Sequence, residues 1–421
     1  MRASLSLVAS LGMSSFVTCS TARLPPSDAP APEPRAPEPA FVSASAVTAT
    51  VSPFGELDVR PESFDFKAHP EVAGRIAESP HAYFRFTQRL FAKATCKRFD
   101  ALYASAPKAR LHGDAHIEQY FVSDLGRGLS DFDDAAVGPT YVDLTRFAAS
   151  TILAARAQGL DPAREKDLLD ELFRGYREGL AGKSLAKEAP PFVATLTKKF
   201  TSDKKGFLLY LDNQLDPADA AEASFVKTEV STYASLAAKD DPKRPPEFFD
   251  IKRLGRTKIG IGSALTRKYI AVLEGTSKAE DDDVVVEIKE VANLADVPCV
   301  KAIAAGAAEA RAAMQQAAGD KKLLRPTLLP NGKFWVNEWL TNYEEARIRK
   351  LMPTDLRDLV FEAGVTLASV HRSPLPDGPS PPKESLAMSA ELEGTIREVA
   401  KELSSETLRG WERFQREVKG T

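Results

Sequence analysis

Residues 112–119 read His-Gly-Asp-Ala-His-Ile-Glu-Gln, and residues 131–135 read Asp-Phe-Asp-Asp-Ala. They are the densest polar cluster of the chain. Mg²⁺ prefers carboxylate and amide oxygens as ligands and usually keeps several waters. Two ligand-bearing loops about a dozen residues apart therefore predict a hairpin that presents a metal ion to phosphate oxygens.

The chemistry that suits this pattern is phosphoryl transfer. Asp114 would be the base that accepts the proton of an acceptor hydroxyl group, and Asp131 would be a metal ligand. Asp133 is a further candidate ligand, because it carries side-chain oxygens in the same loop as Asp131. The alternative is that these side chains form Asx turns and helix caps on solvated loops.

The two stretches resemble those of aminoglycoside phosphotransferases and choline kinases, whose catalytic loop reads His-Gly-Asp-x-x-x-x-Asn and whose metal loop reads Asp-Phe ahead of Asp or Glu and Ala. The resemblance implies a kinase-like enzyme that uses ATP and Mg²⁺. It implies that His112 orients the catalytic loop through hydrogen bonds. A larger set of motifs resembles DUF2252, a bacterial family of unassigned function, over about residues 55–372. These motifs are Ser79–Arg85, Gly113–His116, Asp131–Ala135 and Gly138–Leu144.

One position departs from both families. The asparagine of their catalytic loops is Gln119 here, whose arm is longer by one methylene group and would hold Mg²⁺ at a shifted geometry. This departure favours a second hypothesis, a catalytically silent module that binds a nucleotide or another ligand on a kinase-like scaffold. A third hypothesis, a metallophosphoesterase, fails because the five histidines include no block that completes a two-metal site.

A phosphate clamp is predicted much later in the chain. Gly260-Ile261-Gly262-Ser263 lies between two predicted strands, where missing side chains let backbone N–H groups approach phosphates. Lys289 follows about one strand later, as the phosphate-pairing lysine does in kinases. Glu309, on the helix expected at residues 300–318, is a candidate partner for Lys289. The alternatives are that the glycines form a tight hairpin, that Lys289 faces solvent and that Glu309 is an exposed charge on its helix.

The order of these motifs predicts the fold class. The expected class is α+β, a protein-kinase-like fold of two lobes that is circularly permuted. In ordinary kinases the glycine loop and lysine precede the catalytic loop, whereas in this chain they follow it. Residues 53–250 would form the helical lobe with the catalytic and metal loops, and residues 251–342 the β-rich nucleotide-binding lobe. Residues 343–372 would complete the helical lobe.

Hydrophobic periodicity gives the expected elements. Thr354 is the expected N-cap of the helix at 355–371, and Asn331-Gly332 is the expected turn of a hairpin. Helical spacing runs through residues 68–105, with a helix start at Ser79-Pro80. Further helices are expected at residues 141–158, 162–181, 217–237, 300–318 and 384–419, and strands at residues 254–262, 268–275 and 283–290.

The ends of the chain carry different signals. Residues 1–22 read as an export signal, followed by a Pro-rich disordered linker over residues 23–52, and residues 373–421 form a Pro-rich break and a charged helical tail. The expected location is the periplasm or cell envelope. Cys19 lies in a stretch that resembles a lipoprotein box and would give a membrane tether, whereas cleavage at Ala22 would give a soluble exported protein.

Composition excludes several classes of protein. The chain has 421 residues, of which 43% are hydrophobic, so it can bury a sizeable core. A formal net charge of -3 gives no global positive field, and we expect no nucleic-acid partner. Cys96 and Cys299 allow at most one internal disulfide. The acceptor and the oligomeric state cannot be predicted from the sequence.

Overall fold

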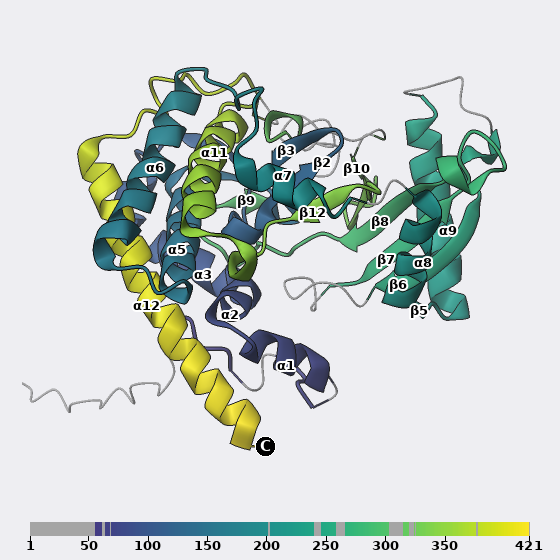
Figure 1. Cartoon of the computed structure of the whole chain (residues 1–421), viewed down its shortest axis with the longest axis horizontal. Coiled ribbons are helices and arrows are strands. Elements are labelled where there is room, and N and C mark those ends of the chain that lie inside the picture. The colour runs from purple at the N-terminus through teal and green to yellow at the C-terminus, as the bar shows by residue number, and fades with distance from the viewer. Residues whose placement is uncertain are drawn as a thin grey trace, which may run out of the picture. The chain divides into compact units, whose positions relative to one another are not determined.

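A computed structural model of the chain shows a mixed α+β fold with several sheets (Figure 1). This confirms the coarse fold class. The residues that the structure describes are 55–60, 64–67, 69–200, 203–239, 246–257, 266–302, 315–319, 324, 326–375 and 378–420.

Several predictions concern residues outside these ranges. They include the export signal and linker over residues 1–52 and most of the helix expected at residues 300–318. Four candidate cofactor-binding residues also lie outside the described residues, namely Gly260, Gly262, Ser263 and Glu309. These features stay predictions.

Most of the helices pack together in one body of the fold (Figure 1). Helix α5 (Tyr141–Ala157) is buried along almost its whole length, against α6 (Pro162–Leu180), α3 (Gln88–Arg98) and α12 (Ala390–Gly420). The other helices of this body are α1 (Pro70–Ala77), α2 (Pro80–Phe86), α4 (Asp100–Tyr103), α7 (Pro191–Thr197) and α11 (Pro353–His371).

Helices α6 and α11 approach each other closely because two glycines face the partner backbone. A Cβ atom at Gly175 would lie 2.1 Å from the carbonyl oxygen of Phe361, and one at Gly364 would lie 2.3 Å from that of Leu172. Only glycine permits this approach. The packing fixes α11, whose last residue, His371, reaches the site described below.

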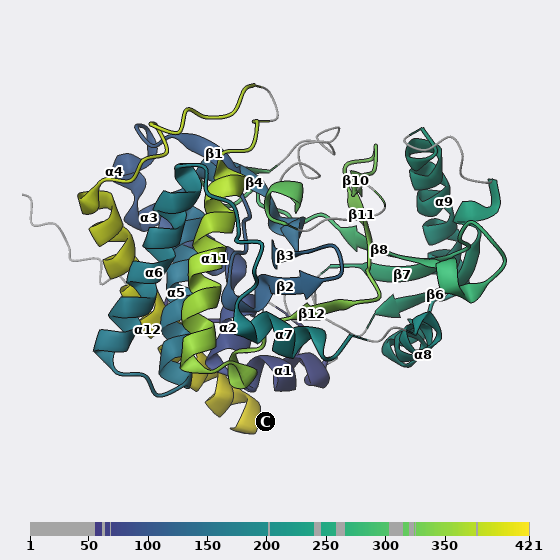
Figure 2. The same cartoon turned by 45° about the horizontal axis from the view of Figure 1, so that its top comes forward.

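A six-stranded antiparallel sheet forms the β-rich part of the fold, in the order β10-β11-β8-β7-β6-β5. Helices α9 (Ala220–Ala237) and α8 (Lys204–Gln214) pack apolar side chains onto its two faces (Figures 1 and 2). The strands are β5 (Leu215–Pro217), β6 (Ile251–Thr257), β7 (Lys268–Leu273), β8 (Val284–Glu290), β10 (Thr327–Leu328) and β11 (Phe334–Glu338).

Two three-stranded sheets bracket the polar loops. The hairpin of β2 (Tyr120–Ser123) and β3 (Gly126–Leu129) pairs with β12 (Tyr343–Glu345). Strands β1 (Lys108–Leu111) and β4 (Ala136–Pro139) pair with each other, and β4 also pairs with β9 (Lys301–Ala302). The catalytic loop therefore runs from β1 to β2 and the metal loop from β3 to β4. The hairpin expected between the two loops is confirmed.

Most of the expected elements are confirmed, and their bounds follow local chemistry. Ser79 caps α2, since its hydroxyl oxygen accepts the N–H of Ala82 at 3.1 Å. Asp219 caps α9, so that helix begins at Ala220. Strands β10 and β11 form the hairpin expected at Asn331-Gly332, where Gly332 has φ 68°.

Some expected bounds are wrong. Thr354 is not the N-cap of α11, because Pro353 begins the helix and Asp355 accepts the N–H of Met352 at 2.9 Å. The helix expected from Val300 does not begin there, because Lys301–Ala302 forms β9. The C-terminal helix begins at Ala390 instead of residue 384. The helical spacing of residues 68–105 is confirmed and corresponds to four helices, α1 to α4.

None of the helices in the described residues is long and apolar enough to cross a membrane.

A disulfide joins Cys96 on α3 to Cys299, 203 positions later, with a Cα–Cα distance of 5.4 Å. The neighbouring Asp296 forms ion pairs with Arg89 and Lys93 on the same helix. The segment that follows β8 is therefore fastened to the helical body by a covalent bond and by ion pairs.

Replacing Cys96 by Ser should lower the free energy of unfolding by about 2–5 kcal/mol, because the disulfide closes a long loop in the unfolded chain. Urea unfolding of the full chain measures this loss. The matched control is Cys19→Ser, which should leave the stability unchanged. Free thiols at both Cys96 and Cys299 in the denatured, unreduced protein would contradict the disulfide.

Candidate functional site

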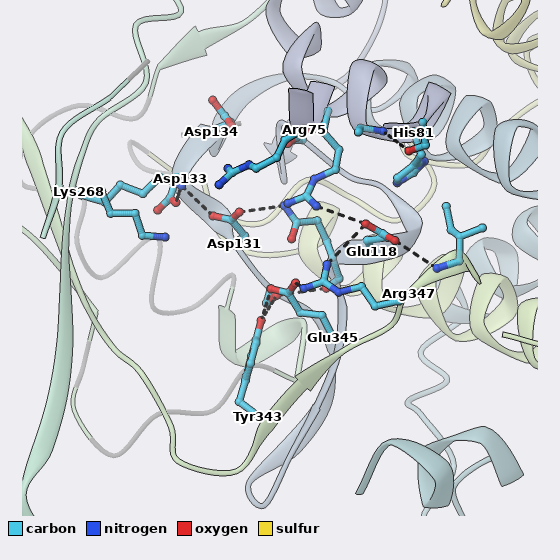
Figure 3. A pocket seen from close by; sticks show the side chains of 18 of the residues that line it. Arg75, His81, Glu118, Asp131, Asp133, Asp134, Lys268, Tyr343, Glu345 and Arg347 are labelled. Atoms are coloured by element: carbon cyan, nitrogen blue, oxygen red, sulfur yellow. Dashed lines mark hydrogen bonds and ion pairs between the residues drawn. The ribbon is translucent and has the colours of Figure 1, made fainter. Parts of the chain in front are cut away.

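A cavity of about 660 Å³ lies where both polar loops meet the six-stranded sheet and helices α1 and α2 (Figure 3). Among the predicted site residues, five line it: Asp114, Gln119, Asp131, Asp133 and Lys289. The structure therefore brings together candidates that lie far apart in the sequence. His112 is fully buried beside them and does not line the cavity.

The two loops touch at Gly113, which has φ 89°. A Cβ atom there would lie 1.9 Å from the carbonyl oxygen of Asp134, so this position requires glycine both for its backbone angle and for the close approach. Burial, and after it the nearby charge of Asp114, raises the pKa of Asp134 to about 7. The carboxylates of the two loops thus lie close enough to influence each other.

Asp143, in the first turn of α5, holds the catalytic loop. Its carboxylate accepts the backbone N–H of His112 at 2.6 Å and that of Gly113 at 2.9 Å. His371 at the end of α11 lies 3.1 Å from the same carboxylate, and Tyr176 contacts the other ring nitrogen of His371 at 2.9 Å. Burial opposes the charge of Asp143, but His371 and the backbone donors hold its pKa below the usual value.

His112 joins the two loops through its ring. Its Nε2 atom lies 2.7 Å from the carbonyl oxygen of Ser130, at the start of the metal loop, and the ring packs against Phe132. This geometry fits the orienting role that the family resemblance implies. Because His112 is buried away from the cavity, it is a positioning residue and does not touch a ligand there.

Asp114 is paired with a buried arginine. Arg146 on α5 donates from Nε to Asp114 Oδ1 at 2.6 Å and lies over the ring of Phe84. Burial raises the pKa of Asp114, and the charge of Arg146 opposes this rise. The Oδ2 atom of Asp114 lies 3.7 Å from Nε2 of His116. The carboxylate is therefore fixed by one oxygen at the edge of the cavity.

Lys289 on β8 of the six-stranded sheet contacts the metal loop, although it follows Asp131 by 158 positions in the sequence. Its ammonium contacts the carboxylate of Asp133 and lies 3.3 Å from Asp131 Oδ1. Burial opposes both charges, but Lys289 holds the pKa of Asp131 well below its usual range. Conversely, Asp131 and Asp133 outweigh burial and raise the pKa of Lys289 well above its ordinary value.

The donors at this point suit a hard cation. Gln119 donates its side-chain N–H to Asp131 Oδ2 at 3.0 Å, so an amide and two carboxylates converge from the two loops. The two carboxylates are oxygen ligands of the kind that fits Mg²⁺ rather than zinc, whereas the Gln119 amide presents its N–H at this point. Within the described residues, no three or more side chains of the types His, Cys, Asp and Glu are grouped as metal ligands, and Lys289 occupies the carboxylates.

Sequence reasoning gave no role to several residues of the site. Asp143 belongs to the polar cluster and to the Gly138–Leu144 motif but was not assigned to the site. Arg146, one helical turn further along α5, was missed, although this spacing was a usable signal for a shared role. Lys268 on β7 pairs with Lys289 on β8 in the sheet register, and its ammonium contacts Glu287. Antiparallel pairing of the two expected strands would have predicted that these residues lie close together. The sequence gave no indication that arginines line the cavity, because exposed arginines are common on helices and loops.

Replacing Gly113 by Ala should lower the free energy of unfolding by about 1–3 kcal/mol or more, because it adds a Cβ at positive φ and against the Asp134 carbonyl. The matched control is Gly74→Ala on α1, where nothing lies within 4 Å, and a gain of roughly 0.5–1 kcal/mol is expected. Thermal unfolding measures both. Equal effects of the two variants would contradict the described loop.

Residues 67–203 and 181–417 match the model of a family described as "Uncharacterized protein conserved in bacteria (DUF2252)". No curated protein and no solved structure matches the chain. The resemblance to this family is confirmed, whereas the resemblance to aminoglycoside phosphotransferases and choline kinases stays a prediction. The chain therefore belongs to the DUF2252 family.

Proposed function

We propose that this chain is a kinase-like phosphotransferase, which transfers the γ-phosphoryl group of ATP to a hydroxyl group of an acceptor in the presence of Mg²⁺. The observation that carries the proposal is the ion pair of Lys289 with Asp131 and Asp133. The lysine and the aspartates were predicted from separate motifs, one for phosphate and one for metal. They line the same cavity as Asp114.

ATP and Mg²⁺ can replace the two partners of this ion pair. When Mg²⁺ is bound, it would neutralise charge on the phosphate oxygens, and Asp131, Asp133 and Gln119 would hold it. Lys289, released from the carboxylates, has a flexible stem and three donors with which to bind the phosphates. Lys268, its cross-strand neighbour, adds a second ammonium at the same wall of the cavity.

Asp114 has the position and environment of a general base. In the proposed reaction the acceptor oxygen forms a bond to the γ-phosphorus, the bond from that phosphorus to the bridging oxygen breaks, and ADP leaves. The proton of the acceptor hydroxyl passes to the Asp114 carboxylate. Burial, which raises the pKa of Asp114, favours this transfer, and Arg146 keeps the carboxylate in place.

The kinase-like two-lobe fold and its circular permutation belong to the same proposal. The six-stranded sheet with Lys289 would be the nucleotide-binding lobe, and the hairpin with the helical body would be the second lobe. In the permuted order, α11 would lead directly into the catalytic loop. The contact of His371, at the end of α11, with Asp143 supports this order, because Asp143 holds the backbone of His112 and Gly113.

A second candidate function is a catalytically silent module that binds a nucleotide or another ligand. The observation that favours it is the contact of Gln119, which directs its side-chain N–H at Asp131. An amide in this orientation competes with a metal ion for the carboxylate. This candidate predicts binding without transfer.

We also propose that the protein is exported to the periplasm or cell envelope. The disulfide between Cys96 and Cys299 supports this location, because structural disulfides persist mainly in oxidising compartments. A lipid on Cys19 would tether the protein to a membrane. ATP is scarce outside the cytoplasm, so transfer before export and use of another phosphodonor belong to the same proposal.

ATP with Mg²⁺ should raise the melting temperature of the full chain, because ligand at a hundred times its dissociation constant adds about 2.7 kcal/mol to stability. The shift should be lost in Lys289→Met and in Asp131→Asn, each compared with its own melting temperature without ligand. Removal of Mg²⁺ with EDTA should reduce the shift in the unchanged chain.

The matched control for Lys289→Met is Lys252→Met. Lys252 lies in the same sheet and pairs with Asp283 at 2.9 Å, away from the cavity. This variant should keep the full ATP shift. The ATP-dependent proposal is wrong if millimolar ATP gives no shift in the unchanged chain.

Measurement of ADP formation distinguishes the proposed enzyme from the catalytically silent module. If Gln119 only weakens the metal site, Gln119→Asn should form ADP faster than the unchanged chain, and Asp114→Asn should be slower by about 10²–10⁴-fold. Folding of each variant is checked by its melting temperature. Binding of ATP without ADP formation in the unchanged chain and in Gln119→Asn would favour the silent module.

A further inference from the structure

A histidine without a hydrogen-bond partner lines the cavity beside α2. His81 is 7% exposed, and neither of its ring nitrogens has a hydrogen-bond partner among the described residues (Figure 3). Buried polar side chains are nearly always hydrogen-bonded, so one without a partner at the wall of a cavity is a candidate for binding a ligand. The proposed phosphotransfer assigns no role to this residue.

The ring of His81 is held in a fixed orientation. Ser79 caps α2, since its hydroxyl oxygen accepts the N–H of Ala82 at 3.1 Å. The His81 ring packs against the ring of Phe84 at 5.7 Å and edge-on against the ring of His116 at 5.3 Å. A ligand that binds His81 therefore meets a side chain that is already ordered.

His81 lies close to the candidate base. His116, whose ring contacts His81, places its Nε2 atom 3.7 Å from Oδ2 of Asp114. Arg146 binds the other oxygen of this carboxylate, Oδ1, so Oδ2 is the atom that remains to accept a proton. Both His81 and Asp114 line the cavity. One small molecule can therefore reach His81 with one group and Asp114 with another.

The protonation state of His81 indicates which group it binds. Burial lowers the pKa of His81 to about 4, so the ring is neutral near pH 7. A neutral imidazole offers one N–H donor and one acceptor nitrogen. A hydroxyl group both donates and accepts hydrogen bonds, whereas an ammonium group only donates and a carboxylate only accepts. A hydroxyl group is therefore suited to either nitrogen of this ring.

The charges around His81 are paired within the chain. Arg85 and Arg347 lie 3.3 Å and 3.5 Å from the carboxylate of Glu118, and Arg347 also contacts Glu345 at 2.8 Å. A charged ligand group at this place would compete with one of these pairs, whereas a hydroxyl group would leave them intact. The surroundings of His81 therefore favour an uncharged group.

The rest of the cavity disfavours an anionic ligand. Among the residues that line the cavity, carboxylates outnumber lysines and arginines by ten to six. The surplus lies on the two polar loops and the six-stranded sheet, which is where we propose that Mg²⁺ binds. These carboxylates would repel an anionic acceptor that approached Asp114.

We propose that His81 is a specificity-determining residue, which binds a hydroxyl group of an uncharged polyol, such as a sugar. A second hydroxyl group of the same molecule lies at Oδ2 of Asp114. The role of the polyol as phosphoryl acceptor rests on the proposed phosphotransfer, whereas its binding to His81 does not.

The test is nuclear magnetic resonance of the full chain with isotope-labelled histidines, in the absence of nucleotide. The signals of the His81 ring nitrogens, assigned by their loss in His81→Phe, are followed while D-glucose, myo-inositol or ribitol is added. At least one of these uncharged polyols should shift the His81 signals saturably at millimolar concentration. The signals of His69, a half-exposed histidine outside the cavity, should not move.

Variants separate binding by His81 from its packing. His81→Phe keeps a ring against Phe84 and His116 but lacks both nitrogens, so it should weaken polyol binding in calorimetric titration by about tenfold or more. His81→Gln keeps a donor and an acceptor and should bind more tightly than His81→Phe. The matched control, His69→Phe, should bind the polyol as the unchanged chain does.

The melting temperature without ligand shows that the variants are folded. His81→Phe should melt no lower than the unchanged chain, because it removes a buried polar group that has no partner. A loss of polyol binding in this variant is then a loss of hydrogen bonds and not of structure.

Charged sugars test the class of ligand. D-glucosamine carries a positive charge and D-glucuronate a negative charge on the ring skeleton of D-glucose. The tightest of the uncharged polyols should bind more tightly than either charged sugar. Tighter binding of a charged sugar would overturn the assignment to an uncharged ligand.

Two further results would overturn the role of His81. They are the absence of a saturable shift of its signals with all three polyols, and equal polyol binding by His81→Phe and the unchanged chain. Failure of the proposed function gives a different result, in which a polyol binds through His81 but ATP produces neither a melting shift nor ADP.

Discussion

The ion pair of Lys289 with Asp131 and Asp133 is the interaction on which the site depends. Lys289 and Asp133 are both buried, and a buried charge is tolerated only when it is paired and hydrogen-bonded. The pair joins the six-stranded sheet to the metal loop across 158 positions of sequence. This contact places the end of β8 beside the metal loop. The same pairing gathers the candidate metal and phosphate residues at one point.

The loops can meet this lysine because the surrounding elements hold their backbones. Two antiparallel strand pairs bracket them, and Asp143 binds the N–H groups of His112 and Gly113. His371 on α11 then fixes Asp143 itself. The carboxylate of Asp114 is therefore placed by a chain of buried contacts that begins in helix packing. A site of this kind is preorganised, so that a ligand does not need to order it.

Local patterns in the sequence predicted much of the fold, because they act over a few residues. The loops around Asp114 and Asp131, the hairpin between them, the hairpin at Asn331-Gly332 and the cap of α2 are all of this kind. Long-range contacts, such as the pairing of Lys301–Ala302 with β4, were not predicted. The convergence of Lys289 on the metal loop was expected only from the family resemblance. Arg146 was missed although it lies one helical turn from Asp143 on α5, because the sequence does not show that this arginine is buried.

We propose that two segments distant in the sequence form one phosphate- and metal-binding centre. The most direct test is a crystal structure of the full chain with a non-hydrolysable ATP analogue and Mn²⁺, located by its anomalous scattering. We predict a Mn²⁺ peak at the oxygens of Asp131, with the triphosphate within reach of Lys289. A nucleotide bound elsewhere, with Lys289 still paired to Asp131 and Asp133, would contradict it.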